Sequence, residues 1–128
     1  MKINLGLFFG GKSVEHEVAV ISASQTLAAL DADKYEVIPV YISKDNELYT
    51  GEALKDVNNF KDMKKLLSQC QQVALQRDKR KVNLLRYPAK LFTNPVIASL
   101  DLAFPVVHGT NGEDGSLQGF FQLLGLPY

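Results

Sequence analysis

The sequence predicts an α/β domain of three layers, in which helices cover both faces of a mainly parallel sheet. Two observations predict this class: apolar runs of strand length alternate with helical patterns, and a glycine-rich loop follows both the first and the last run. Both runs are nearly continuous, which is typical of strands buried on two faces. A chain of 128 residues, 46% of them hydrophobic, has the size and makeup of one domain.

The N-terminal third is expected to form one strand–helix–strand unit. Residues 2–9 are an apolar strand that ends at Gly10. Residues 13–30 follow with a helical pattern, and Ser13 is placed to cap its first turn. Residues 35–42 are a second strand, rich in β-branched and aromatic side chains. Such a unit makes the two strands parallel, with a right-handed crossover.

The middle of the chain is expected to hold an inserted hairpin and helix region. Residues 43–46 are a turn cluster, and residues 47–50 return as a short antiparallel strand. Residues 60–70 are predicted to be one amphipathic helix, with apolar side chains on one side and lysines on the other.

Weak alternation in residues 73–75 and 82–85 predicts a hairpin with the charged segment 77–81 at its tip. This segment is basic, so a nucleic-acid patch is an alternative. A solvated turn is the favoured interpretation, because no aromatic side chains interleave with the basic residues.

The C-terminal part repeats the pattern of strand, glycine loop and helix. Residues 100–107 are predicted to be a strand, and the loop 108–115 follows it directly. Residues 116–124 have the apolar spacing of a helix, and Gly125 stands where a glycine C-cap belongs. Residues 126–128 then resemble the start of a further strand.

Composition and charge exclude several classes of function. Fourteen basic and fourteen acidic residues give a formal net charge of zero, so we expect no binding to nucleic acid or to an anionic membrane. The uncharged stretches are too short to cross a bilayer, and no secretory signal is evident, so a cytoplasmic location is expected. The single Cys70 excludes a disulfide framework, and the presence of only two histidines, His16 and His108, argues against a histidine-built metal centre.

Residues 6–13 match the letters of a phosphate-binding P-loop, GxxxxGK[ST]. In a working P-loop the four variable residues form the loop, whereas here Leu7, Phe8 and Phe9 are the most strand-like residues of the segment. Glu15 and Glu17 would also repel a triphosphate from the helix start. A P-loop nucleotide binder is therefore only a minor alternative.

The first glycine loop offers one candidate binding group, Glu15. One interpretation is structural, because a carboxylate in the first helical turn interacts favourably with the helix dipole, as Glu17 also would. The other is functional, because ligands of open α/β sheets bind at the carboxyl ends of the strands. A carboxylate there suits a cationic group such as an ammonium.

The second glycine loop offers His108 at its start and the amides of the helix start at Ser116. His108 is either a structural histidine or a ligand group, and its place at the same predicted sheet edge as Glu15 keeps the functional interpretation open. Glu113 and Asp114 are better interpreted as helix caps.

Together the segments GGKSVEHEVAVISA (10–23) and HGTNGEDGSLQGFFQLLGLPY (108–128) resemble the two signature stretches of the N-terminal domain of D-alanine:D-alanine ligases. The resemblance covers essentially the whole chain, although residues 55–95 match loosely. It implies a Rossmann-like, pre-ATP-grasp domain of a cytoplasmic enzyme of peptidoglycan synthesis. D-alanine:D-lactate and D-alanine:D-serine ligases are closely similar, and the sequence does not choose among them.

The resemblance also implies roles for individual residues. Glu15 holds the ammonium of the first D-alanine, Val18 lies beside its methyl group, and His108 lies near the substrate carboxylate and the reacting centre. The family uses ATP and Mg²⁺, and no residue of this sequence is assigned to either.

The family's remaining ATP-grasp domains are expected after residue 128, so residues 1–128 are expected to be a single substrate-binding domain without ligase activity of its own. Its expected partners are D-alanine, those domains and a second copy in a homodimer. A stand-alone module of flavodoxin-like topology is the alternative from another class.

Overall fold

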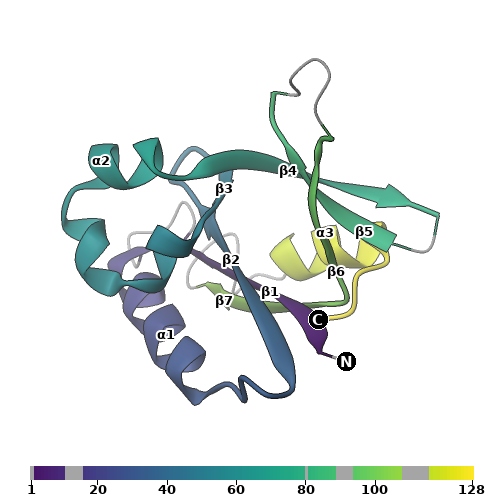
Figure 1. Cartoon of the computed structure of the whole chain (residues 1–128), viewed down its shortest axis with the longest axis horizontal. Helices are drawn as coiled ribbons and strands as arrows, with labels where there is room; N and C mark the ends of the chain where they lie inside the picture. Colours follow the sequence, from purple (N-terminus) through teal and green to yellow (C-terminus); the bar gives the residue numbers. More distant parts are fainter. Residues whose placement is uncertain (1, 11–15, 80, 89–93, 108–115) are drawn as a thin grey trace.

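The protein folds into a mixed β-sheet with helices on both faces (Figure 1). The computed structural model describes residues 2–10, 16–79, 81–88, 94–107 and 116–128, and for residues 16–19, 107 and 116–118 it describes the backbone alone. Within these ranges seven strands pair in the order β6-β5-β4-β3-β2-β1-β7. The strands are β1 (Ile3–Gly10), β2 (Tyr35–Ile42), β3 (Leu48–Thr50), β4 (Gln71–Asp78), β5 (Lys81–Arg86), β6 (Val96–Leu100) and β7 (Leu102–Val107). The helices are α1 (His16–Ala29), α2 (Met63–Ser68) and α3 (Ser116–Leu124), with 3₁₀ segments η1 (Glu52–Lys55) and η2 (Val57–Lys61).

Strand β1 lies between two parallel neighbours. It pairs with β2 on one side and β7 on the other, so that Leu7 is aligned with both Pro39 and Phe104. Its side chains from Leu5 to Phe9 are almost completely buried. The parallel pairing of β1 with β2 confirms the predicted strand–helix–strand unit. The nearly continuous apolar run is explained because β1 has no solvent-facing side over this stretch.

The side chains of β1 divide between two cores. Phe8 points into the core beneath α3, where its ring centroid lies 4.7 Å from that of Phe121. Leu7 and Phe9 belong to the opposite core, which contains Val20 of α1. Helices α1 and α3 therefore cover opposite faces of the sheet, as a three-layer domain requires (Figure 1).

The remaining strands form the antiparallel half of the sheet, from β2 through β3, β4 and β5 to β6. This half contains the expected inserted hairpin, β4–β5. Val73, Val82 and Leu84 from the hairpin belong to the same core as Phe8 and Phe121. The core-facing side of the hairpin consequently packs in the same core as α3 (Figure 1), whereas residues 76–79 near its tip are exposed, as expected for a solvated turn.

The prediction of one helix over residues 60–70 is wrong. The chain forms η2 and then the short helix α2, separated by Asp62 in an extended conformation. The Asp62 carboxylate accepts a hydrogen bond from the backbone N–H of Lys65 (3.2 Å), which caps α2 and ends the preceding turn. None of the helices in the described part of the chain is long and apolar enough to cross a membrane.

The predicted strand over residues 100–107 is divided by a bend. Leu100 ends β6, which the sequence did not predict, and β7 begins at Leu102. Asp101 at the bend accepts a hydrogen bond from the Asn4 N–H and donates its own N–H to the Asn4 carbonyl, both at 2.8 Å. After α3, Pro127 accepts a hydrogen bond from Ala103 of β7 (2.7 Å), so the expected strand start at 126–128 runs beside that strand.

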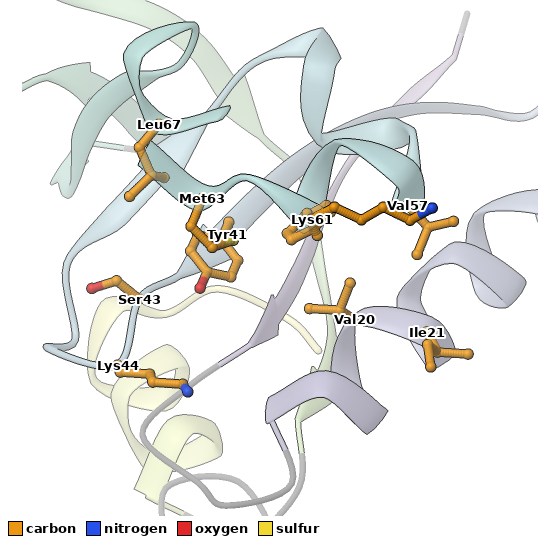
Figure 2. A pocket seen from close by; sticks show the side chains of 10 residues that line it. Val20, Ile21, Tyr41, Ser43, Lys44, Val57, Lys61, Met63 and Leu67 are labelled. Carbon is orange, nitrogen blue, oxygen red and sulfur yellow. The ribbon is translucent and has the colours of Figure 1, made fainter. Parts of the chain in front are cut away.

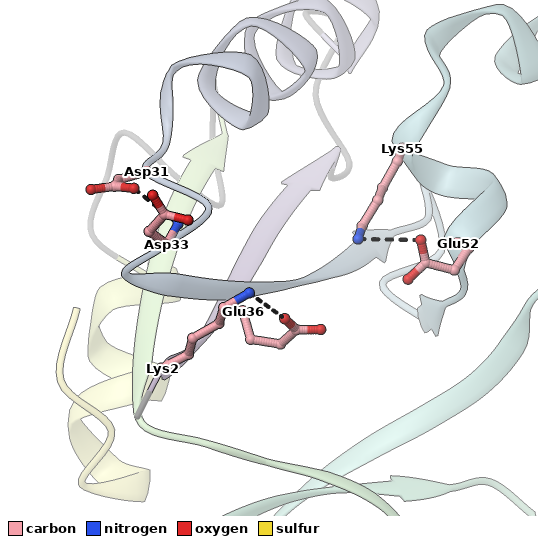
Figure 3. A network of polar contacts seen from close by, with 6 residues as sticks. All are labelled: Lys2, Asp31, Asp33, Glu36, Glu52 and Lys55. Carbon is pink, nitrogen blue, oxygen red and sulfur yellow. Dashed lines mark hydrogen bonds and ion pairs between the residues drawn. The ribbon is translucent and has the colours of Figure 1, made fainter.

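Charged side chains make a few local contacts on the surface (Figure 3). Lys2 and Glu36 approach to 3.9 Å at the amino ends of β1 and β2. Lys55 and Glu52 approach to 3.2 Å within η1. Because exposed ion pairs contribute about 0–1 kcal/mol, the two cores carry the stability of the fold.

Replacing Phe121 by Ala tests the core beneath α3. The ring is fully buried, so we expect the free energy of unfolding to fall by about 3–5 kcal/mol, measured by urea denaturation with circular dichroism. Leu123→Ala is the matched control on the same helix, because Leu123 is 90% exposed, and a change within about 0.5 kcal/mol is expected there. Equal losses in the two variants would contradict this packing of α3.

Candidate functional site

The candidate site lies where β1 and β7 end together. These strands are parallel neighbours, and Gly10 is aligned with Val107 in the pairing. The chain leaves β1 through α1 to β2 on one side, whereas β7 lies on the other side and leads to α3 on the opposite face. Open α/β sheets bind ligands in the crevice outside the carboxyl ends of strands at such a reversal of strand order.

Gly10 controls how the chain leaves β1. Its φ of 99° lies in the region that favours glycine. A Cβ atom there would also collide with the Ile42 carbonyl oxygen and lie 2.9 Å from the ring of Tyr41. The first glycine of the loop is thus required by both backbone conformation and space.

The site residues predicted from the sequence fall mainly outside the described residues. This applies to Glu15 and His108, and also to Glu113 and Asp114. Val18 lies in α1, but its side chain is outside the described part. In the sequence Glu15 directly precedes α1 and His108 directly follows β7.

A cavity of about 440 Å³ lies next to this edge, on the face that α1 covers (Figure 2). Its polar groups come from the end of β2 and the segment after it, with Tyr41, Ser43 and Lys44, and from Lys61 of η2. The other lining residues are apolar: Val20, Ile21, Val57, Phe60, Met63 and Leu67. The cavity therefore suits an apolar ligand group, with the positive charges of Lys44 and Lys61 close by.

Sequence reasoning did not find these cavity residues. The only available signal was that β2 is parallel to β1, so its carboxyl end with Tyr41 and the following Ser43 had to reach the same edge. The contribution of η2 and α2 depends on contacts between distant segments and has no local pattern.

The described residues give little support to a metal site, a reactive thiol or a P-loop. Among them no group of three or more His, Cys, Asp or Glu side chains is placed to hold a metal ion. Burial raises the pKa of the Cys70 thiol, which disfavours the thiolate at neutral pH. Strand β1 continues through Gly10, so the strand interpretation of Leu7, Phe8 and Phe9 is confirmed and the P-loop alternative lacks its loop.

The fold defines an α/β domain with two parallel strands that end side by side, and comparison with known proteins specifies its family. Residues 4–128 match the family model described as D-ala D-ala ligase N-terminus. The chain belongs to this family of D-alanine–D-alanine ligase N-terminal domains.

Similar proteins include the D-alanine–D-alanine ligases of Thermosipho melanesiensis and Natranaerobius thermophilus. The first is 45% identical over 126 residues, which cover 98% of this chain and 33% of that ligase. The second is 39% identical over 132 residues, covering 99% and 33%. The chain therefore spans about a third of the length of these relatives.

Solved structures with a similar fold include a Coxiella burnetii D-alanine-D-alanine ligase, with a TM-score of 0.77 and 29% identity over 99% of this chain and 34% of that one. The VanG D-Ala:D-Ser ligase of Enterococcus faecalis gives a TM-score of 0.73 and 32% identity over 99% of this chain and 35% of that one. The predicted α/β fold class is thus confirmed, with a sheet that is mixed because the pairs from β2 through β6 are antiparallel.

Replacing Gly10 by Ala tests the turn at the end of β1. The strained φ and the collision with Ile42 are expected to lower the free energy of unfolding by about 2 kcal/mol or more. Gly119→Ala is the control, because a Cβ at Gly119 in α3 meets no atom within 4 Å. Helix propensity predicts a gain of up to about 1 kcal/mol there. Urea denaturation measures both, and tolerance of Ala at residue 10 would contradict the described turn.

Proposed function

We propose that this chain is the substrate-binding domain of an ATP-dependent D-alanine–D-alanine ligase of peptidoglycan synthesis. The observation that carries the proposal is the match of residues 4–128 to the ligase N-terminal family. The alignment of Gly10 with Val107 supports it, because the two signature loops then start from neighbouring strand ends. In the proposed reaction one D-alanine is activated as an acyl phosphate, and the amine of a second D-alanine displaces phosphate to form the dipeptide.

Glu15, Val18 and His108 are the proposed substrate-binding residues. Glu15 binds the ammonium of the first D-alanine through a charge-assisted hydrogen bond. Its place directly before α1 supports this role, because the positive end of the helix dipole favours the ionised carboxylate. Val18 contacts the substrate methyl group. His108 contacts the substrate carboxylate near the reacting centre and is the proposed catalytic residue of this domain.

ATP and Mg²⁺ are proposed for the whole protein and not for this domain. Among the described residues no group of three or more His, Cys, Asp or Glu side chains is placed to hold a metal ion, and residues 7–9 of the P-loop pattern belong to β1. The relatives are about three times as long as the matched segment. We therefore propose that further ATP-grasp domains supply the nucleotide and metal ligands, in a cytoplasmic protein where ATP is available.

A domain of a D-alanine:D-serine ligase is a second candidate, favoured by the match to VanG at 32% identity. The two candidates share the first D-alanine and differ in the second substrate. Supplying D-serine or D-alanine as the acceptor to the whole enzyme, and identifying the product by mass spectrometry, distinguishes them.

Glu15→Gln in the whole enzyme tests the proposed ammonium contact. Loss of the charge-assisted pair is expected to raise the KM for the first D-alanine by roughly tenfold or more. Glu17→Gln is the matched control, because Glu17 has the same charge near the same helix end but no proposed contact, and its KM is expected to stay within about twofold. An unchanged KM in Glu15→Gln would show that Glu15 serves only the helix dipole.

The 128-residue chain alone is expected to release no phosphate from ATP in the presence of D-alanine, because none of its residues is proposed to hold ATP or Mg²⁺. A coupled phosphate assay measures this, with the whole enzyme as the positive control. Release of phosphate that depends on D-alanine by the chain alone would contradict the division of roles between the domains.

A further inference from the structure

The cavity drawn in Figure 2 has an opening bordered by exposed apolar side chains. Ile21 of α1 is 52% exposed and Val57 of η2 is 38% exposed, although both side chains are large and apolar. The two lie on facing elements, with Lys61 of η2 beside Val57 (Figure 2). Apolar side chains that remain exposed around a concave surface are typical of a place where a ligand binds.

Aromatic rings support the cavity from within. Tyr41 and Phe60 line it, and their ring centroids lie 5.6 Å apart. Both rings also contact Phe9 of β1, at 5.7 and 5.9 Å between centroids. Phe9 and Tyr41 belong to the buried core beneath α1, so these walls are formed before any ligand binds. A preformed site avoids the entropic cost of ordering its side chains on binding.

The size and chemistry of the walls indicate the kind of ligand. The volume of about 440 Å³ falls within the range of about 300–1,000 Å³ that is usual for small-molecule sites. Most of the described lining residues are apolar, so burial of an apolar chain would be the main source of affinity. A ligand rich in polar groups would leave many of them without partners against these walls.

The charged side chains that line the cavity favour an anionic group at its edge. Lys44 and Lys61 are both basic, and none of the described lining residues is acidic. Within the described part of the chain no carboxylate forms an ion pair with Lys61. The backbone of η2 is held at its start, where the Asp56 carboxylate accepts a hydrogen bond from the N–H of Asn58 (3.0 Å). Lys61 therefore offers a positive charge from a fixed segment beside the apolar opening.

We propose that this cavity binds a small aliphatic carboxylate of the medium-chain fatty acid class. The aliphatic chain lies between α1 and η2 against the aromatic rings, and the carboxylate meets the Lys61 ammonium at the opening. None of the residues proposed to bind D-alanine is assigned to this site. The site is thus an addition to the proposed ligase function, and no step of that function depends on it.

Titration of the 128-residue chain with octanoate tests the proposal. The chain has two methionines, and Met63 lines the cavity, so a ¹³C-labelled methionine methyl group reports its occupancy. We expect a saturable shift of the Met63 methyl resonance in the NMR spectrum. The ligands 1-octanol and octylamine carry the same chain with no charge and with the opposite charge, and we expect them to bind about threefold and tenfold more weakly. Octylamine binding as tightly as octanoate, or no saturable shift with octanoate, would overturn the proposal.

Lys61→Met tests the contact with the carboxylate. The dissociation constant for octanoate is expected to rise by about fivefold, and that for 1-octanol to stay within about twofold. Lys65→Met is the matched control, because Lys65 carries the same charge on α2 and does not line the cavity. An equal rise in the two variants would indicate only a general effect of charge and would refute the assigned contact.

Ile21→Trp tests the location, because a larger side chain at this exposed position narrows the opening. Octanoate is expected to bind about tenfold more weakly to this variant. Leu123→Trp is the control of equal size on α3, where Leu123 is 90% exposed and α3 covers the opposite face. Its binding is expected to stay within about twofold of the wild type. Unchanged binding in Ile21→Trp, or an equal loss in Leu123→Trp, would place the ligand elsewhere.

Calorimetric titration of the whole enzyme with octanoate completes the test. The dissociation constant is expected to agree with that of the 128-residue chain within about threefold. Loss of binding in the whole enzyme would overturn the proposal, because another part of the protein would then fill the cavity. These titrations measure binding without a ligase assay, so a failure of this site and a failure of the proposed function are distinguishable.

Discussion

The burial of β1 on both faces, together with its pairing on both edges, is the constraint on which the rest of the structure depends. Its alternate side chains require two separate cores, so α1 and α3 must cover opposite faces. Its two parallel neighbours bring the end of β7 beside Gly10. The adjacency of the two strand ends is therefore a geometric result of how one apolar strand is covered.

Much of this framework could be predicted from local patterns. The run at the start of the chain, the helix after it and β2 follow from the distribution of apolar residues. Gly125 was identifiable as a helix end because a glycine directly after the apolar spacing is typical of a C-cap, and its φ of 71° agrees. Glu15 and His108 were identifiable as candidates because each borders a glycine loop at a strand end. Their assignment to D-alanine came from the family resemblance, since a carboxylate beside a helix is equally well explained by the dipole.

The features that escaped prediction depend on contacts between distant segments. Strand β6 was hidden because Asp101 bends the chain within one apolar run, and that bend is held by Asn4 at the other end of the sequence. The break before α2 depends on one capping carboxylate, Asp62, that could equally have been an exposed helical residue. The cavity beside β2 and the hydrogen bond that Arg77 of β4 donates to the Leu124 carbonyl of α3 likewise join segments that have no shared sequence signal.

The pairing of β1 with β7 also has a consequence for synthesis. Asn4 and Asp101 are 97 residues apart, so this pairing encloses most of the chain and belongs to the slow, non-local class of contacts. While the chain emerges from the ribosome, the edge of β1 that pairs with β7 is unpaired, and Phe8 lacks its ring contact with Phe121. Unpaired apolar strands of this kind associate readily with other chains. The pairing that aligns Gly10 with Val107 therefore leaves β1 exposed to association with other chains until β7 and α3 are in place.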